Sequence, residues 1–273
     1  MSRQRQAAVG DALYIGHGWV AYVGKVPVID IHRHPAIAYC VGLETAFRAY
    51  DVEESIETEA RTFYVPADAR SPRMDARGRP MGFFFVSADS PIYYRLKQQM
   101  GSEKAIADNS ALSHAVVEFL RQLYWERPWC TLAERRVEAM FGVGVREALP
   151  VDPRVARALA ILSRRPEVVD SAARLAEHLG LSETRFVHLF SEETGLPFRR
   201  FRLWARLLRG GPHLRSISSL THLAVGVGFA DLAHLSRSFR TLFGLRTTAV
   251  IRLNSGLTVR LLKEQEDRKR RGR

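Results

Sequence analysis

Two segments in the C-terminal third of this 273-residue sequence share one pattern, and this repeat constrains the fold more than any other feature. The segment LAEHLGLSETRFVHLFSEETG spans residues 175–195, and LAVGVGFADLAHLSRSFRTLFG spans residues 223–244. Each begins with Leu-Ala, passes through a glycine, and continues with apolar residues at helical spacing until a second glycine. A repeat of this kind predicts two similar helical hairpins in the folded chain.

Sequence signals mark the helix boundaries inside each copy. Gly180 and Gly228 end the first apolar stretch, where glycine readily adopts the positive φ that closes a helix. Ser182 and Asp231 follow, and both residue types accept hydrogen bonds from the free N–H groups that begin a helix. The register shifts by one residue between the copies, at Ala230 in the turn. Each copy therefore predicts helix, tight turn and capped helix, which is the outline of a helix-turn-helix unit.

The second helix of each unit has an apolar side and a polar side. Phe186 and Phe190 in the first copy match Leu235 and Phe239 in the second, and we expect these to pack inward. The side chains left for solvent are Thr184, Arg185 and His188 in the first copy and Ala233, His234, Arg237 and Arg240 in the second. Arginine can bind guanine through two hydrogen bonds in the major groove. The alternative is an ordinary helical hairpin with solvated arginines, and two aligned copies favour DNA binding over it.

The charge distribution singles out the same region. Residues 1–150 contain 18 basic and 18 acidic side chains, whereas residues 151–273 contain 23 and 11. The entire net charge of +12 therefore falls in the C-terminal part. A basic domain beside a neutral one indicates a polyanionic partner for the basic domain, although a solvated basic surface with a basic tail is the plainer explanation.

Residues 152–250 resemble the DNA-binding domain of AraC/XylS-family transcription regulators. The resemblance is carried by LAEHLGLS, RFVHLF, ETGLPFRRF and SLTHLAVGVGFADLAHLSRSFRTLFG, in that order. It implies two helix-turn-helix units, joined by a long helix, that enter successive major grooves on one face of DNA. On that basis Thr184, Arg185 and His188 face one groove, and His234, Arg237 and Arg240 face the next.

Two places depart from the family pattern. Gly210-Gly211-Pro212 interrupts the connecting segment, and proline costs about 3 kcal/mol inside a helix, so we expect a kink or break there. A break leaves the spacing of the two recognition helices open. After Gly244 the chain reads Leu245-Arg246-Thr247-Thr248, where the family commonly has a proline turn.

The N-terminal half has a different texture. Short alternating stretches such as PVIDIH, TFYVPA and GFFFVSA lie within residues 26–95, separated by turn-forming residues, which predicts a β-sandwich or small barrel. From about residue 103 the pattern becomes helical, with an apolar stripe formed by Leu112, Val116, Phe119, Leu120 and Leu123. These helices either pack on the β domain or pair with another subunit, and we expect a homodimer through residues 103–141. Thr131 and Glu134 have the spacing of a capping box that opens a helix through Phe141.

The domain boundary is placed at residues 149–151, because Asp152-Pro153 begins a further helix with proline at its first position. The expected fold class is α+β. The N-terminal half resembles the cupin-like sensor domain of many family members, so we expect a cupin-like β domain with dimerisation helices over residues 1–150. An all-α domain of two helix-turn-helix units is expected over residues 151–255, and a basic tail over residues 256–273.

The stretch IDIHRHPAIAYCVG is the best candidate for a ligand site. His32 and His34 resemble the histidine pair that begins a cupin metal site, but no carboxylate or further histidine follows at the required spacing. No metal or other cofactor is therefore expected. The two histidines are expected to be structural or to contact an effector, and Arg33, Arg70 and Arg73 either meet an anionic effector or are simply solvated.

The remaining features predict a cytoplasmic protein. Cys40 and Cys130 lie far apart and form no CxxC pair, which fits a reducing compartment. Cys130 precedes an expected helix N-terminus, which can lower a thiol pKa, but a buried, inert thiol is the favoured interpretation. The N-terminus has no apolar signal segment, and no apolar run approaches the roughly 20 residues of a membrane span, so no membrane partner is expected.

Together these observations predict a DNA-binding transcription regulator and not an enzyme. The expected partners are promoter DNA, a second copy of the chain, RNA polymerase and an unidentified small-molecule effector. Activation by recruiting polymerase is what the resemblance implies, and repression is equally compatible with the residues. Two enzymatic alternatives remain: a cupin-like small-molecule enzyme, disfavoured by its missing ligands, and an Ada-type DNA repair protein, whose four-cysteine zinc site two cysteines cannot build.

Overall fold

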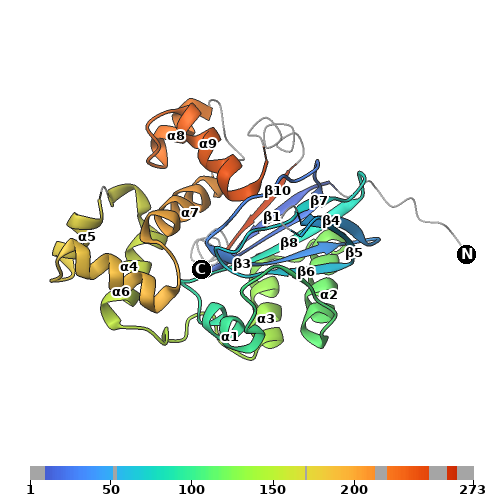
Figure 1. Cartoon of the computed structure of the whole chain (residues 1–273), viewed down its shortest axis with the longest axis horizontal. Helices are drawn as coiled ribbons and strands as arrows, with labels where there is room; N and C mark the ends of the chain where they lie inside the picture. The colour runs from blue at the N-terminus through green and yellow to red at the C-terminus, as the bar shows by residue number, and fades with distance from the viewer. Residues whose placement is uncertain (1–9, 52–53, 170, 213–219, 246–256, 263–273) are drawn as a thin grey trace, which may run out of the picture.

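The computed structural model describes residues 10–51, 54–169, 171–212, 220–245 and 257–262. It has a β-rich N-terminal part and a helical C-terminal part, which lie side by side in Figure 1. The N-terminal part holds a seven-stranded sheet and a three-stranded sheet. This arrangement confirms the expected α+β class.

The larger sheet has the strand order β10-β1-β2-β8-β3-β6-β9, and the smaller sheet has the order β5-β4-β7. Neighbouring strands of the larger sheet pair antiparallel except β1 and β10, which are parallel. The strands of the larger sheet are β1 (Ala12–Ile15), β2 (Trp19–Lys25), β3 (Ala36–Gly42), β6 (Thr62–Val65), β8 (Pro80–Ser87), β9 (Ile106–Ala107) and β10 (Thr258–Leu261). The strands of the smaller sheet are β4 (Phe47–Asp51), β5 (Ile56–Ala60) and β7 (Arg73–Asp75).

Strands β3 and β8 are adjacent in the middle of the larger sheet and are buried along their whole length. Successive side chains of a strand point to opposite faces of the sheet. Tyr39 and Phe84 accordingly belong to a core cluster on one face, and Cys40 and Phe85 belong to a cluster on the other. Burial on both faces explains why AIAYCVG and GFFFVS are apolar at nearly every position.

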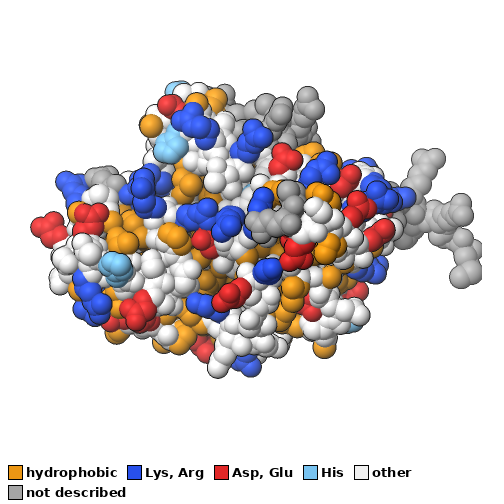
Figure 2. All heavy atoms as spheres, viewed as in Figure 1, with side chains coloured by type: hydrophobic (Ala, Val, Ile, Leu, Met, Phe, Trp, Pro, Cys, Tyr) orange, Lys and Arg blue, Asp and Glu red, His pale blue; other side chains and the backbone are white. Residues whose placement is uncertain are grey.

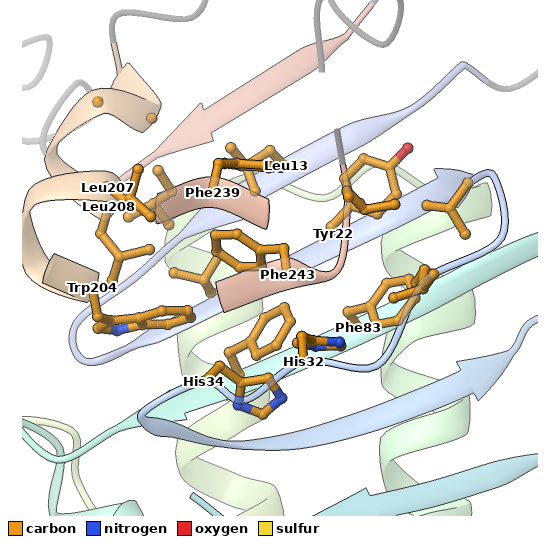
Figure 3. A pocket seen from close by; sticks show the side chains of 18 of the residues that line it. Leu13, Tyr22, His32, His34, Phe83, Trp204, Leu207, Leu208, Phe239 and Phe243 are labelled. Atoms are coloured by element: carbon orange, nitrogen blue, oxygen red, sulfur yellow. The ribbon is translucent and has the colours of Figure 1, made fainter. Parts of the chain in front are cut away.

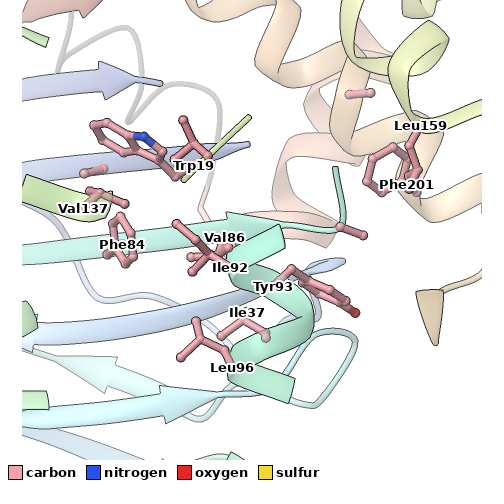
Figure 4. Close-up of a cluster of buried hydrophobic side chains, with 14 of the residues drawn as sticks. Trp19, Ile37, Phe84, Val86, Ile92, Tyr93, Leu96, Val137, Leu159 and Phe201 are labelled. Atoms are coloured by element: carbon pink, nitrogen blue, oxygen red, sulfur yellow. The ribbon is translucent and has the colours of Figure 1, made fainter. Parts of the chain in front are cut away.

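Helices α1 (Pro91–Met100), α2 (Ala111–Trp125) and α3 (Cys130–Phe141) follow the β-strands in sequence, and α2 covers one face of the larger sheet (Figure 1). Figure 4 shows the core beneath α1, where Ile92 and Leu96 lie near Val86 and Ile37. The apolar stripe of α2 belongs to the same core, and Val116, Leu120 and Leu123 are fully buried. The stripe that led us to expect a dimer through residues 103–141 is therefore covered by the sheet of its own chain.

The capping box expected at Thr131 is wrong. The N-cap of α3 is Trp129, two residues before Thr131, and its side chain makes no capping hydrogen bond. Glu134 instead turns toward the β domain, where its carboxylate accepts a hydrogen bond from the backbone N–H of His17 (3.1 Å) and lies 2.7 Å from that residue's Nδ1. The Glu134 side chain therefore bonds to a residue that is distant in the sequence, His17, and does not cap its own helix.

The C-terminal part is helical, as expected. Its elements are α4 (Pro153–Arg164), the short 3₁₀ helix η1 (Pro166–Val168), α5 (Ala172–His178), α6 (Glu183–Thr194), α7 (Phe198–Gly210), α8 (Leu220–Gly226) and α9 (Leu232–Phe243). Asp152 caps α4 by accepting from the N–H of Arg154, with Pro153 at the first helical position, which confirms that start. None of the described helices is long and apolar enough to cross a membrane.

The connecting helix α7 ends where the glycines and proline predict a break. Its last residue is Gly210, and Gly211 still has helical dihedral angles (φ −52°, ψ −48°). The next described helix is α8, which begins at Leu220.

The expectation of a basic tail over residues 256–273 needs a correction. Thr258–Leu261 form β10, which pairs in parallel with β1 so that Val259 lies opposite Leu13. Val259 is 1% exposed, and Leu262 is also buried. The apolar residues of this short stretch explain the correction, because they complete the edge of the N-terminal sheet. The basic run at residues 263–273 lies outside the described residues.

The two parts of the chain share one hydrophobic core. A single cluster of buried residues runs from the helix-covered face of the sheet to Phe186, Phe190 and Phe201 in the helical part. Polar contacts cross the same boundary: Tyr93 donates to the backbone oxygen of Thr194 (2.9 Å), and Arg200 pairs with Asp68. The helical part is therefore attached to the β domain over a broad surface.

Candidate DNA interface and ligand cavity

Helices α5 and α6 form the first helix-turn-helix unit. Gly180 closes the first helix with φ +69°, and the Ser182 side chain accepts from the N–H of Arg185 (3.3 Å) to begin α6. The inner side of α6 is buried, with Phe186 and Phe198 stacked edge to face at 5.1 Å. The expected outer residues, Thr184, Arg185 and His188, are all exposed on the solvent side of the helix.

Helices α8 and α9 form the second unit. Gly228 has φ +87°, and Asp231 accepts from the N–H of His234 (2.6 Å) to begin α9. Of the expected outer residues, Ala233 and Arg237 are exposed and Arg240 is exposed near the end of the helix. His234 is half-buried, because its ring packs edge-on against Phe229 with the centroids 5.2 Å apart.

The guanidinium groups on these two faces are available to a partner. Within the described part of the chain, no carboxylate lies at ion-pair distance from Arg185, Arg237 or Arg240. Figure 2 shows many Lys and Arg side chains on the helical part of the molecule, together with histidines. Exposed cations without an internal partner are what a phosphate- and base-contacting surface requires.

An apolar cavity of about 190 Å³ lies on the opposite side of α9, where the helical part meets the sheet (Figure 3). The sheet contributes side chains that include Leu13, Val20, Phe83 and Phe85. The helices contribute Trp204, Leu207 and Leu208 from α7 and Leu235, Phe239 and Phe243 from α9. Both domains therefore form the wall of one cavity.

His32 and His34 are the expected ligand-site residues that the structure brings to this cavity. Their ring centroids are 5.3 Å apart. Burial lowers the pKa of His34 to about 3, and the neighbouring His32 adds to that effect. Burial likewise lowers the pKa of His32 to about 4. Both rings are therefore neutral at pH 7.

The arginines expected beside them lie elsewhere. Arg70 lines a separate polar depression together with Arg33, and Arg73 is exposed on β7. The structure thus divides the expected ligand-binding set into a buried neutral pair and outlying cations. Within the described residues, no group of three or more His, Cys, Asp or Glu side chains has an arrangement that could hold a metal ion.

Trp204 is a cavity residue for which the sequence predicted no ligand-binding role. Its ring does pack, at 5.6 Å from Phe85 and 5.5 Å from Phe243. Its indole Nε1 is buried and has no hydrogen-bond partner in the described part of the chain. The amphipathic pattern of FRRFRLWARLL places Trp204 on the apolar side of α7, but only the fold shows what lies opposite.

Neither cysteine has the environment of a reactive thiol. Burial raises the pKa of Cys40 to about 12 and that of Cys130 to about 12. Cys130 lies within α3 beside β1 and its Sγ is 3.5 Å from the backbone oxygen of Ile15. A thiol that stays protonated is a poor nucleophile, which counts against a cysteine-based methyl acceptor.

Comparisons with known proteins agree with this geometry. Residues 175–252 match the family model described as a helix-turn-helix domain. The crystal structure of ToxT from Vibrio cholerae O395 is similar over 88% of this chain and 100% of its own, with 10% identity and a TM-score of 0.54. Unsaturated fatty acid-bound ToxT from Vibrio cholerae strain SCE256 is similar over 89% and 98%, with 9% identity and a TM-score of 0.54.

A third solved structure is ToxT from Vibrio cholerae O395 bound to (E)-4-(8-methylnaphthalen-1-yl)but-3-enoic acid, with 11% identity, coverage of 87% and 100%, and a TM-score of 0.51. No curated protein sequence gives a significant match. At these identities the structural likeness establishes the fold. Residues 175–252 therefore match a helix-turn-helix domain, and the chain that carries them has a fold similar to that of ToxT.

Proposed function

We propose that this protein is a sequence-specific, effector-responsive transcription regulator that binds promoter DNA through α6 and α9. The observation that carries this proposal is the pair of capped helices whose outer faces present arginines that pair with no carboxylate among the described residues. They belong to the part of the chain that holds the whole net charge of +12. Counterion release from DNA favours binding by such a surface, and base contacts provide the specificity.

The two helices have separate tasks in this proposal. Thr184, Arg185 and His188 contact base edges in one major groove. Ala233, Arg237 and Arg240 face the next groove, and Ala233 allows a close approach. His234, held against Phe229, contributes the exposed edge of its ring.

The effector acts through the cavity between the domains. Solved structures of ToxT contain an unsaturated fatty acid or a naphthalene-based acid, so this fold accommodates small organic ligands. In the present chain His32 and His34 are the effector-contacting residues that the cavity supports. Arg70 and Arg73 lie outside it and would serve only a ligand bound elsewhere.

Further parts of the proposal follow from its role at a promoter. The regulator acts in the cytoplasm, works with RNA polymerase, and combines two half-sites as a homodimer. Because the α2 stripe is internal, the dimer contact must lie on another surface. Sedimentation of the intact chain with and without DNA tests the dimer.

The test of the proposed function uses the full chain and a library of genomic DNA fragments. We expect enrichment of a defined sequence and an affinity whose logarithm falls with log salt by roughly 0.9 for each neutralised phosphate. A variant combining Arg185→Ala with Arg237→Ala is expected to lose the enriched sequence. Arg135→Ala, on an exposed position of α3, is the matched control and should keep it. Equal retention by both variants would contradict the proposed reading faces.

A further inference from the structure

The wall of the interdomain cavity carries no charged side chain among the described residues. Its polar groups are few, and most are already used. The Tyr22 hydroxyl donates to the backbone oxygen of Lys25 (3.0 Å). A carboxylate placed here would lose its hydration and gain no cation from the described wall, which is strongly unfavourable.

The two histidines offer acceptors. His34 Nδ1 lies 2.8 Å from the backbone oxygen of Ala36, and His32 Nδ1 lies 2.9 Å from that of Asp30. A carbonyl oxygen accepts only, so each Nδ1 carries the proton and donates it. Each Nε2 of these neutral rings is then left with a lone pair, which repels an anion and accepts from a neutral donor.

Trp204 supplies an unused donor. Its side chain lines the cavity, is 1% exposed, and its Nε1–H has no partner in the described part of the chain. A buried donor without a partner is unfavourable, and buried polar groups in proteins are normally paired. A ligand that presents a carbonyl or hydroxyl oxygen to this indole relieves that cost.

The cavity volume sets the size of the occupant. A dry cavity of about 150 Å³ is sufficient for benzene. At about 190 Å³, the present cavity accommodates one aromatic ring with a small substituent.

From these observations we propose that the cavity binds a small uncharged molecule, an apolar ring or similar body with one carbonyl or hydroxyl group hydrogen-bonded to Trp204 Nε1. This inference rests on the proposed function in that it names the effector class of the same regulator. It sets this chain apart from the fatty acid- and butenoic acid-bound structures of ToxT, whose ligands are acids.

Helix α9 lies between the cavity and the proposed DNA-binding face. Phe239 and Phe243 of α9 line the cavity, while Arg237 and Arg240 of the same helix are exposed. A ligand between the sheet and α9 therefore contacts the back of the helix whose front faces DNA, and its binding changes the affinity of the full chain for DNA.

The experiment uses three probes of nearly equal shape: acetophenone, which is neutral and has a carbonyl; α-methylstyrene, which lacks the oxygen; and benzoate, which is an anion at pH 7. Binding to the full chain is measured by calorimetry and by the ligand-induced rise in Tm. We expect acetophenone to bind about fivefold tighter than α-methylstyrene, as one hydrogen bond predicts. We expect benzoate to bind at least about a hundredfold more weakly than acetophenone.

Two variants assign the binding to this cavity and to this donor. Val20→Phe fills the cavity from β2 and should abolish acetophenone binding, whereas Val28→Phe, at an exposed position outside the wall, should not. Trp204→Phe keeps an aromatic ring but removes the donor, so acetophenone and α-methylstyrene should then bind within about twofold of each other. Unchanged binding to Val20→Phe, or benzoate binding as tightly as acetophenone, overturns the inference.

The affinity of the full chain for DNA is measured separately, with and without acetophenone. Absence of sequence-specific DNA binding by the full chain refutes the proposed function while leaving ligand binding to be judged by calorimetry. If acetophenone binds to the full chain but leaves its affinity for specific DNA unchanged, the coupling through α9 is refuted.

Discussion

Phe243, the last residue of the second recognition helix, packs edge to face against Phe85 of strand β8, with the ring centroids 6.0 Å apart. Trp204 of α7 contacts both rings. Leu242 is fully buried in the same cluster on the sheet. Helix α9 is therefore fixed to the β domain at its C-terminal end, so a change in the β domain alters where the helix lies.

Gly244, directly after Phe243, is the tightest point of this attachment. Its backbone oxygen accepts from the N–H of Asp30 (3.0 Å), and its φ is +64°. A Cβ at this position would lie 2.1 Å from the Asp30 backbone oxygen. Gly244→Ala should therefore destabilise the chain through left-handed strain of about 1–2 kcal/mol and a further contribution of about 1–3 kcal/mol from overpacking.

Gly180→Ala is the matched control, measured by urea unfolding alongside Gly244→Ala. Gly180 has φ +69°, but a Cβ at this position would have nothing within 4 Å of it among the described residues. Gly180→Ala should therefore lose only the free energy of unfolding that left-handed strain costs, about 1–2 kcal/mol. Equal losses of unfolding free energy in the two variants would mean that the contact with Asp30 does not stabilise the chain.

The C-terminal strand β10 is expected to stabilise the whole chain. Val259 is 1% exposed and lies opposite Leu13 of β1. Val259→Asp buries a carboxylate without a partner, which costs on the order of several kcal/mol. Val28→Asp, at an exposed valine, should change the free energy of unfolding by less than about 0.5 kcal/mol. A Tm for Val259→Asp within one or two degrees of wild type, roughly the shift of such a surface change, would show that β10 does not pair in solution.

The buried histidines predict a loss of stability in acid. Burial lowers the pKa of His34 to about 3 and that of His32 to about 4, from an ordinary value of 6.5. As pH falls below about 6.5, the unfolded chain binds protons that the folded chain does not, so stability decreases until pH reaches about 4 to 3. Each histidine then removes up to about 1.4 kcal/mol per pH unit.

Substituting His34→Phe should remove about half of this histidine-dependent slope, measured as unfolding free energy against pH between about 6.5 and 4. His114→Phe, at an exposed position of α2, should leave the slope unchanged. A slope that is the same in wild type and His34→Phe would assign the acid sensitivity to other groups.

Local signals predicted the two helix-turn-helix units accurately. Gly180, Gly228, Ser182 and Asp231 all have the capping roles that their residue types predict, because caps depend on a few neighbouring residues. The proline start of α4 and the end of α7 at Gly210 follow from the same local chemistry.

Features that depend on distant partners were not predictable in this way. The stripe of α2 specifies an apolar contact but not whether the partner is the same chain or another. Thr131 and Glu134 have capping spacing, yet His17 attracts the carboxylate. The role of Trp204 and the pairing of β10 with β1 require the juxtaposition of residues more than a hundred positions apart, which no local pattern encodes.

The last prediction concerns base reading by the two recognition helices. Arg237 is exposed on α9, one turn after Ala233, and no carboxylate pairs with it in the described structure. If Arg237 binds a guanine, Arg237→Ala should weaken specific binding by about 1–3 kcal/mol and relax the preference at one base position. An arginine that contacts only phosphate behaves differently, because its loss weakens all sequences about equally and reduces the salt slope by about one.

The first recognition helix should read a second position. Arg185→Ala and His188→Ala are expected to relax a preference about 10 base pairs away, since successive major grooves on one face of DNA are one helical turn apart. The measurement is the affinity of each variant for a set of single-base changes in the enriched sequence, with Arg135→Ala as the control. Because α7 ends at Gly210, the separation of the two affected positions also reports how far apart the chain holds α6 and α9. Base preferences that stay at the wild-type pattern in all three variants would show that these outer faces do not read DNA.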